Sequence, residues 1–70
     1  MNTFQDVIKA LGGGAVLAAD IGENPITVRQ WGNRGSIPVK YWPAIITAAK
    51  EKRVKGISYQ TLARLVEARA

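Results

Sequence analysis

Four side chains near the middle of the chain have types and a spacing that suit contact with the edges of DNA bases. Ile26, Arg29, Gln30 and Asn33 recur at helical intervals, so on a helix they share one face. Arg and Gln pair with guanine and adenine in the major groove, and an apolar side chain suits a thymine methyl. We therefore expect Arg29 to contact a guanine and Gln30 an adenine or a nearby phosphate. Ile26 would meet a thymine methyl, or is simply an incidental surface isoleucine, and Pro25 completes the expected base-reading set.

A second set of residues flanks this face and suits contacts with phosphate groups, which position a protein on DNA without reading its sequence. Backbone N–H groups at the start of a helix near Gly14 would face an anion. Cationic side chains follow the base-reading face, although Arg34 could equally be a solvated loop arginine. The expected phosphate contacts are Gly14, Asn24, Thr27, Arg34 and Lys40.

The turn Gly22-Glu23-Asn24-Pro25 must position this face. Glycine ends a helix in the left-handed conformation without a Cβ penalty, Asn is a strong N-cap, and Pro suits the first helical position. The sequence therefore predicts one helix over Ala15–Ile21 and a second that begins at Asn24 or Pro25.

Apolar side chains behind the turn form two stripes, Leu17, Ala18 and Ile21 before it and Val28 and Trp31 after it. They can bury each other only if the two helices meet at a steep angle. That arrangement is the helix-turn-helix.

These same residues resemble the signature of the Cro-like helix-turn-helix family, whose best-known members are small phage and prophage regulators. The matching positions are the small Ala18, the turn glycine Gly22, and the core residues Val28 and Trp31. Downstream, Trp31-Gly32, Gly35-Ser36-Ile37-Pro38 and Tyr41-Trp42-Pro43 are similar to short prophage-type members in which an Ile-Pro turn leads into the next helix. The resemblance covers about Thr3 to Arg53. It implies a DNA-binding transcriptional regulator, more often a repressor than an activator.

Three further helices are expected around this unit. Thr3 and Asp6 form a capping box before a stripe of Phe4, Val7, Ile8 and Leu11, and that helix ends at Gly12-Gly13-Gly14. The three glycines lack the GK[ST] of a phosphate-binding P-loop, so a tight turn is the better interpretation.

The segment from Gly32 to Ser36 is expected to be a helix end and an exposed loop. A fourth helix follows over Val39–Arg53, with a tight or 3₁₀-like start because of Pro43. Its predicted apolar stripe is Val39, Trp42, Ile45, Ile46 and Ala49, and both tryptophans are expected in the core.

The basic run Lys50–Lys55 complements the negative end of that helix, or contacts DNA directly. Gly56 is the expected terminator and Ser58 the N-cap of a last helix, Tyr59–Arg69. Its stripe of Leu62, Leu65 and Val66 forms a dimer interface, or packs back onto the first helix.

Composition excludes several classes of function. The 70 residues include no Cys and no His, so the usual general base, the most reactive nucleophile and the commonest transition-metal ligands are missing. We expect no catalytic residue, no metal, no cofactor and no small-molecule ligand. Ten Lys and Arg against five Asp and Glu give a net charge of +5, which favours an anionic partner. No apolar run approaches the ~20 residues that span a bilayer, and the first residues do not resemble a secretory signal, so a cytoplasmic protein is expected.

The sequence thus predicts an all-α bundle of about five short helices in one domain, residues 1–70, with residues 54–70 as a possible dimerisation element. The expected function is sequence-specific binding of double-stranded DNA, as a homodimer. The alternative is a protein-interaction module on the same scaffold, whose affinity would depend little on salt.

Overall fold

The computed structural model describes residues 2–69, and every regular element in that range is helical. The elements are α1 (Phe4–Ala10), α2 (Gly14–Ile21), α3 (Pro25–Arg34), the 3₁₀ turn η1 (Val39–Tyr41), α4 (Trp42–Glu51) and α5 (Tyr59–Arg69). The predicted all-α architecture of about five short helices is confirmed.

Local sequence signals set most of the helix ends. The Thr3 hydroxyl accepts a hydrogen bond from the Asp6 N–H at 3.1 Å, and the Asp6 carboxylate accepts from the Asn2 and Thr3 N–H groups. Those backbone donors, Asn2 foremost, hold the pKa of Asp6 below its usual value. Ser58 caps α5 in the same way, accepting from the Thr61 N–H at 3.2 Å. The predicted capping box and the Ser58 cap are therefore confirmed.

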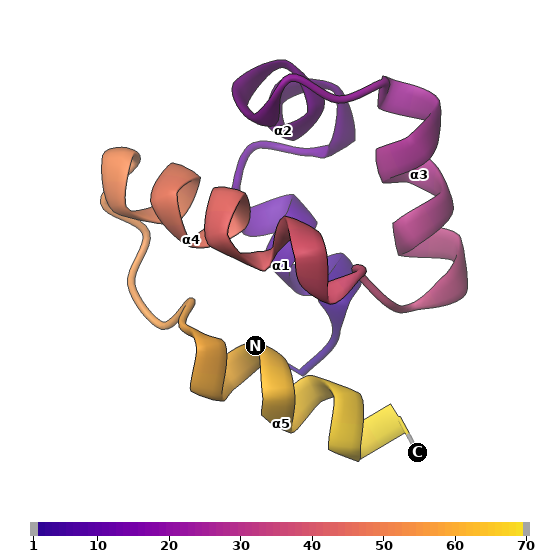
Figure 1. Ribbon diagram of the computed structural model, residues 1–70, viewed down its shortest axis with the longest axis vertical. Coiled ribbons are helices and arrows are strands. Elements are labelled where there is room, and N and C mark those ends of the chain that lie inside the picture. The colour runs from indigo at the N-terminus through magenta and orange to yellow at the C-terminus, as the bar shows by residue number, and fades with distance from the viewer. Residues whose placement is uncertain (1, 70) are drawn as a thin grey trace.

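The helices pack around one apolar core. In Figure 1, α2 is seen nearly end-on while α3 runs down the picture, so their axes cross steeply. Helix α1 packs against both of them, α4 lies against α2, and α5 packs on α4. The indole N–H of Trp42 donates to the Ile37 carbonyl at 2.9 Å, which satisfies the one polar atom of a buried ring. Both tryptophans lie in the core, as predicted.

Two predicted boundaries are wrong, and a third is given more exactly by the structure. The end of α3 was expected between Gly32 and Ser36, and the helix ends at Arg34, with Gly35 as its left-handed C-cap (φ 70°). Helix α2 begins at Gly14, one residue earlier than expected. Helix α4 ends at Glu51, two residues before the predicted end at Arg53, because Arg53 itself adopts the left-handed conformation (φ 57°); Gly56, the expected terminator, lies farther along and also has a positive φ (89°).

The apolar pattern also predicted Val39 wrongly, as a member of the buried stripe of α4. Its side chain is 64% exposed, not part of the α4 stripe. Residues 39–41 form a 3₁₀ turn with about three residues per turn, so the helical period of α4 cannot be extended back to them. The 3₁₀ start itself, with Pro43 in the first turn of α4, is as predicted.

The last helix buries two of the three residues of its apolar stripe within this chain. Leu62 and Leu65 are buried in the core of this chain, in the same cluster as Phe4 of α1. Of the three residues predicted for a dimer interface, Val66 alone is exposed. Leu62 and Leu65 are therefore unavailable to a partner while the chain stays folded.

Candidate nucleic-acid interface

Helix α3 is fixed at both ends by its own sequence. The Asn24 side-chain oxygen accepts a hydrogen bond from the Ile26 N–H at 2.8 Å, and Pro25 occupies the first turn. Just before it, Gly22 ends α2 in the left-handed conformation (φ 70°), and the Glu23 N–H bonds the Ala18 carbonyl at 2.8 Å. The turn therefore joins α2 to α3 between a left-handed Gly22 and an extended Asn24.

The two sides of α3 differ sharply in exposure. Val28 is fully buried and Trp31 nearly so, which anchors the inner side of the helix in the core. Ile26, Arg29, Gln30 and Asn33 are all exposed, and Ile26 exposes 63% of its surface. The predicted exposure of this face is confirmed, and the helix presents it without a covering element.

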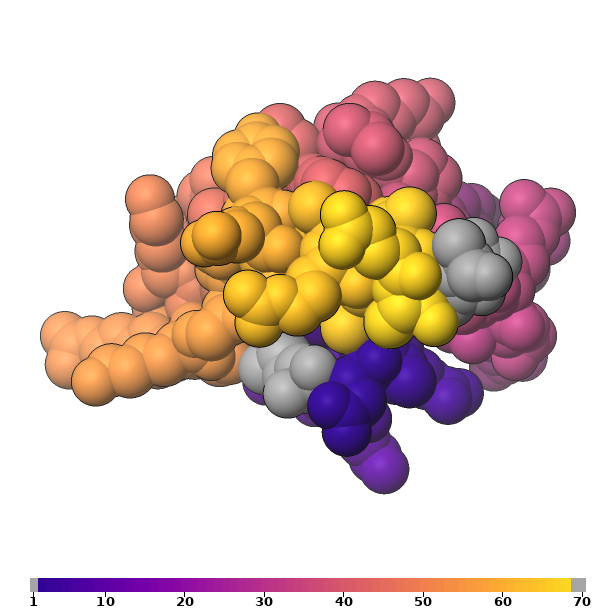
Figure 2. All heavy atoms as spheres, turned by 90° about the horizontal axis from the view of Figure 1, so that it is seen from below, coloured from indigo at the N-terminus to yellow at the C-terminus, as the bar shows by residue number. Residues whose placement is uncertain are grey.

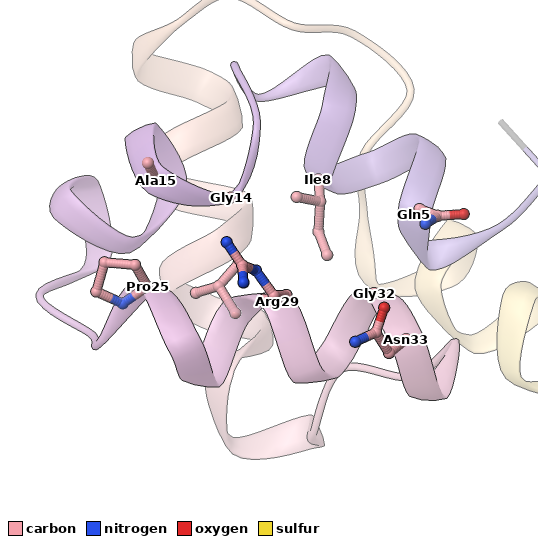
Figure 3. Close-up of a pocket in the computed structure, with 9 residues that line it drawn as sticks. Gln5, Ile8, Gly14, Ala15, Pro25, Arg29, Gly32 and Asn33 are labelled. Atoms are coloured by element: carbon pink, nitrogen blue, oxygen red, sulfur yellow. The ribbon is translucent and has the colours of Figure 1, made fainter.

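A groove of about 290 Å³ runs along one edge of this face. Arg29 and Asn33 project into it from the side of α3 that faces α1 (Figure 3), and the start of α2 borders it. Its lining residues are Gln5, Ile8, Gly14, Ala15, Pro25, Val28, Arg29, Gly32 and Asn33. The structure thus brings together Gly14 and Arg29, which were predicted for phosphate and base contact.

Gln5 is a polar residue of this groove that the sequence did not single out. It is exposed on α1, and its position beside α3 depends on how the two helices cross. Nothing in its sequence neighbourhood distinguishes it from any other polar residue on the outer side of α1.

A polar contact joins the turn before α3 to the segment after it. The Tyr41 hydroxyl donates a hydrogen bond to the Glu23 carboxylate, which also accepts from the Asn24 N–H at 3.0 Å. These two donors, Tyr41 first, and the nearby charge of Lys40 lower the pKa of Glu23, while the carboxylate raises the pKa of Tyr41. The Lys40 ammonium lies 5.1 Å from the centre of the Tyr41 ring, within cation–π range.

The remaining candidates for phosphate contact occupy different environments. Asn24 is exposed and uses its side-chain oxygen as the helix cap, whereas Thr27 is half-buried. Lys40 extends over the Tyr41 ring from η1. Arg34 is the last residue of α3 and lines a second hollow, with Thr3 of the α1 cap and Leu65 of α5. These residues surround α3 without forming one cluster.

Residues 2–69 contain no group of three carboxylates or other metal ligands that could hold an ion. Within the same range, none of the helices has both the length and the apolar composition needed to cross a membrane.

Comparison of the chain with protein-family models, with curated proteins and with solved structures finds no match.

Proposed function

We propose that this protein binds double-stranded DNA sequence-specifically, with α2 and α3 acting as a helix-turn-helix. The observation that supports this most directly is the asymmetry of α3, whose inner side is anchored by Val28 and Trp31 while its outer side presents Arg29 and Gln30 to solvent. A helix about 10–12 Å across fits a major groove about 12 Å wide. A rigidly capped helix with an uncovered polar face suits that groove.

In the proposed complex, α3 lies in the major groove and its exposed side chains read the bases. Arg29 donates to the two acceptors of a guanine, and Gln30 pairs with an adenine or reaches a nearby phosphate. Ile26 contacts a thymine methyl, and Pro25 and Asn33 complete the surface at either end. Gln5, which lines the same groove from α1, is an additional polar contact.

Contacts with phosphates set the register of α3 in the groove. Gly14 and Ala15, at the start of α2, line the same groove as Arg29, and backbone N–H groups at a helix start suit a phosphate. Asn24, Thr27, Arg34 and Lys40 supply the other phosphate contacts around the recognition face. The net charge of +5 favours this association and makes it depend on salt.

The biological role that fits such a module is transcriptional regulation in the cytoplasm, of the kind performed by the Cro-like regulators that the sequence resembles, with repression favoured over activation. Binding as a homodimer would double the length of the recognised site. The alternative, a protein-interaction module, draws on the exposed apolar side chains of Ile26 and Val39.

Selection of bound duplexes from a random DNA library, repeated at two salt concentrations, tests the proposal. A sequence-specific protein enriches one motif at both concentrations, and its affinity falls steeply as salt increases. Recovery of unrelated sequences at both concentrations would reject sequence-specific binding. Weak, salt-insensitive binding would favour the protein-interaction alternative.

A further inference from the structure

The end of α4 carries a dense group of cations, which we call the basic turn: Lys50, Lys52, Arg53 and Lys55. All four side chains are exposed. In Figure 1 this segment lies at the side of the molecule away from α3, and in Figure 2 its orange side chains extend well beyond the body of the protein. The basic turn is therefore a surface separate from the face of α3.

The backbone of the basic turn is strained at Arg53. Four helix ends in the described chain close with the same backbone hydrogen bond, from an N–H to the carbonyl five residues earlier: Gly13 to Ile8, Glu23 to Ala18, Ser36 to Trp31 and Val54 to Ala49. The residue before each donor is left-handed, and three of these four residues are glycines. At the end of α4 it is Arg53, the one non-glycine residue with positive φ (57°) between residues 2 and 69.

An arginine at that position is unfavourable for the fold, because its Cβ approaches the following carbonyl in the left-handed conformation. Glycine would satisfy the same backbone geometry without that strain. Residues with strained backbone conformations cluster at functional sites. The positive charge of Arg53 at the tip of the turn is the property that glycine would remove.

The cations of the basic turn are poorly compensated within the chain. Lys52 pairs with Asp20 of α2 at 2.9 Å, whereas Lys50, Arg53 and Lys55 form no ion pair among the residues that the structure describes. Glu51 is the one acidic residue of the segment. The one large apolar side chain of the turn, Val54, packs on the core. Membrane-binding surfaces combine cations with exposed apolar side chains, so this turn, whose Val54 packs on the core, is better suited to phosphates of a nucleic acid.

We infer that the basic turn binds the phosphate backbone of a second DNA segment, so that one molecule bridges two duplexes. The inference rests on the proposed binding of a first duplex by α3. The molecule measures 28 × 24 × 19 Å, and the two surfaces lie on different sides of it. A second segment can approach the turn while the first stays on α3.

The variant Arg53→Gly should raise the stability of the fold and weaken binding by the basic turn, because it relieves the backbone strain and removes the charge. One experiment measures thermal melting, affinity for a single duplex carrying the selected site, and capture of a second, labelled duplex by protein loaded on an immobilised one. We expect Arg53→Gly to melt about 4 °C higher than the original chain. Its affinity for the single duplex should stay within about twofold, and its capture of the second duplex should fall about fivefold at moderate salt.

Two matched variants identify the surface responsible. Lys50→Gln with Lys55→Gln removes charge without touching the strained residue and should lower capture similarly, whereas Arg64→Gln, on the exposed side of α5, should not. The variant Arg29→Ala tests whether α3 binds the first duplex. If its affinity for the single duplex is unchanged, the proposed function is contradicted, but the role of the basic turn is not.

Three results would overturn the inference. The first is capture by Arg53→Gly equal to that of the original chain. The second is absence of capture by the original chain when it binds the first duplex. The third is binding to phosphatidylserine vesicles that Arg53→Gly abolishes, with no capture of DNA, which would assign the turn to a membrane surface.

Discussion

The rings of Trp31 and Tyr41 are packed together with their centroids 4.7 Å apart and their planes at 48°. Trp31 is on the inner side of α3, and Tyr41 is in η1, after the loop that follows that helix. Because the Tyr41 hydroxyl also donates to Glu23, one side chain connects the turn before α3, its buried side and the segment after it. The orientation of α3 is therefore maintained from outside the helix as well as by its caps.

The variant Tyr41→Phe keeps the ring contact and removes the hydrogen bond, so it should change the pH dependence of stability. The pKa of Glu23 in the folded protein lies below its ordinary value of 4.5. As the pH falls, the unfolded chain therefore takes up this proton first, so the stabilisation is complete above about pH 4.5 and is lost as the pH falls through the folded pKa. Tyr41→Phe should lose stability less steeply than the original chain in that acid range, as measured by melting at a series of pH values.

Tyr59→Phe is the matched control, because it removes a hydroxyl from an exposed tyrosine on α5. Its melting temperatures should follow those of the original chain across the series. Parallel curves for Tyr41→Phe as well would show that the contact with Glu23 does not stabilise the fold.

Trp31→Ala should destabilise the fold by about 3–5 kcal/mol, since the ring is nearly buried and packs on Tyr41. A core of this size contributes only about 3–5 kcal/mol in total, so little folded protein should remain. Trp31→Phe should retain a cooperative transition at a lower temperature. Circular dichroism melting measures both. If Trp31→Ala melted normally but failed to bind DNA, the ring would belong to the interface instead.

Arg29→Ala should relax the base preference at one position and lower affinity for the best site by about 1–3 kcal/mol. The reason is the place of Arg29 on the exposed edge of α3, where it shares the groove with Gln5 and Asn33. Duplex selection with the variant gives the preference, and titration gives the affinity. An unchanged motif bound at full affinity would mean that α3 does not read the bases.

Asn24 offers a test in which folding and binding respond differently. Asn24→Ala removes the cap of α3 and should lower stability by about 1 kcal/mol. Asn24→Asp keeps the cap but adds a negative charge where a phosphate is expected, so it should melt normally and bind DNA about fivefold more weakly. Equal DNA affinity for Asn24→Asp and the original chain would remove Asn24 from the interface.

The sequence predicted the helices well because their ends are determined by neighbouring residues. Thr3 with Asp6, Gly22, Asn24 with Pro25, and Ser58 each act within a few residues, and the structure places all of them as caps or turns. Apolar spacing within each helix was equally informative, and it identified nearly all of the core.

The errors arise where several competing residues or tertiary contacts decide the outcome. Two glycines three residues apart, Gly32 and Gly35, could each have ended α3, and the structure uses the second. The spacing of apolar residues in α4 does not extend back to Val39, because η1 is a 3₁₀ turn with fewer residues per turn than an α-helix. The place of Gln5 in the groove and the contact between Glu23 and Tyr41 depend on how distant segments pack. No pattern within one helix can reveal such contacts.

The last prediction is that the protein binds its site as a homodimer through the exposed side of α5. A single recognition helix reads only a few base pairs, whereas two related by a two-fold axis contact half-sites about 34 Å apart. Leu62 and Leu65 are buried in the monomer, so Leu65→Asp would unfold it, and Val66 is the residue of the predicted set that remains for a partner. Val66→Asp should keep the fold and weaken binding to a palindromic site, while Ala63→Asp tests the neighbouring exposed position on α5.

Sedimentation of the protein with its selected duplex gives the stoichiometry. One protein per duplex on a site without an inverted repeat would exclude the dimer. A palindromic site bound normally by a folded Val66→Asp variant would retain the dimer and place its interface away from Val66.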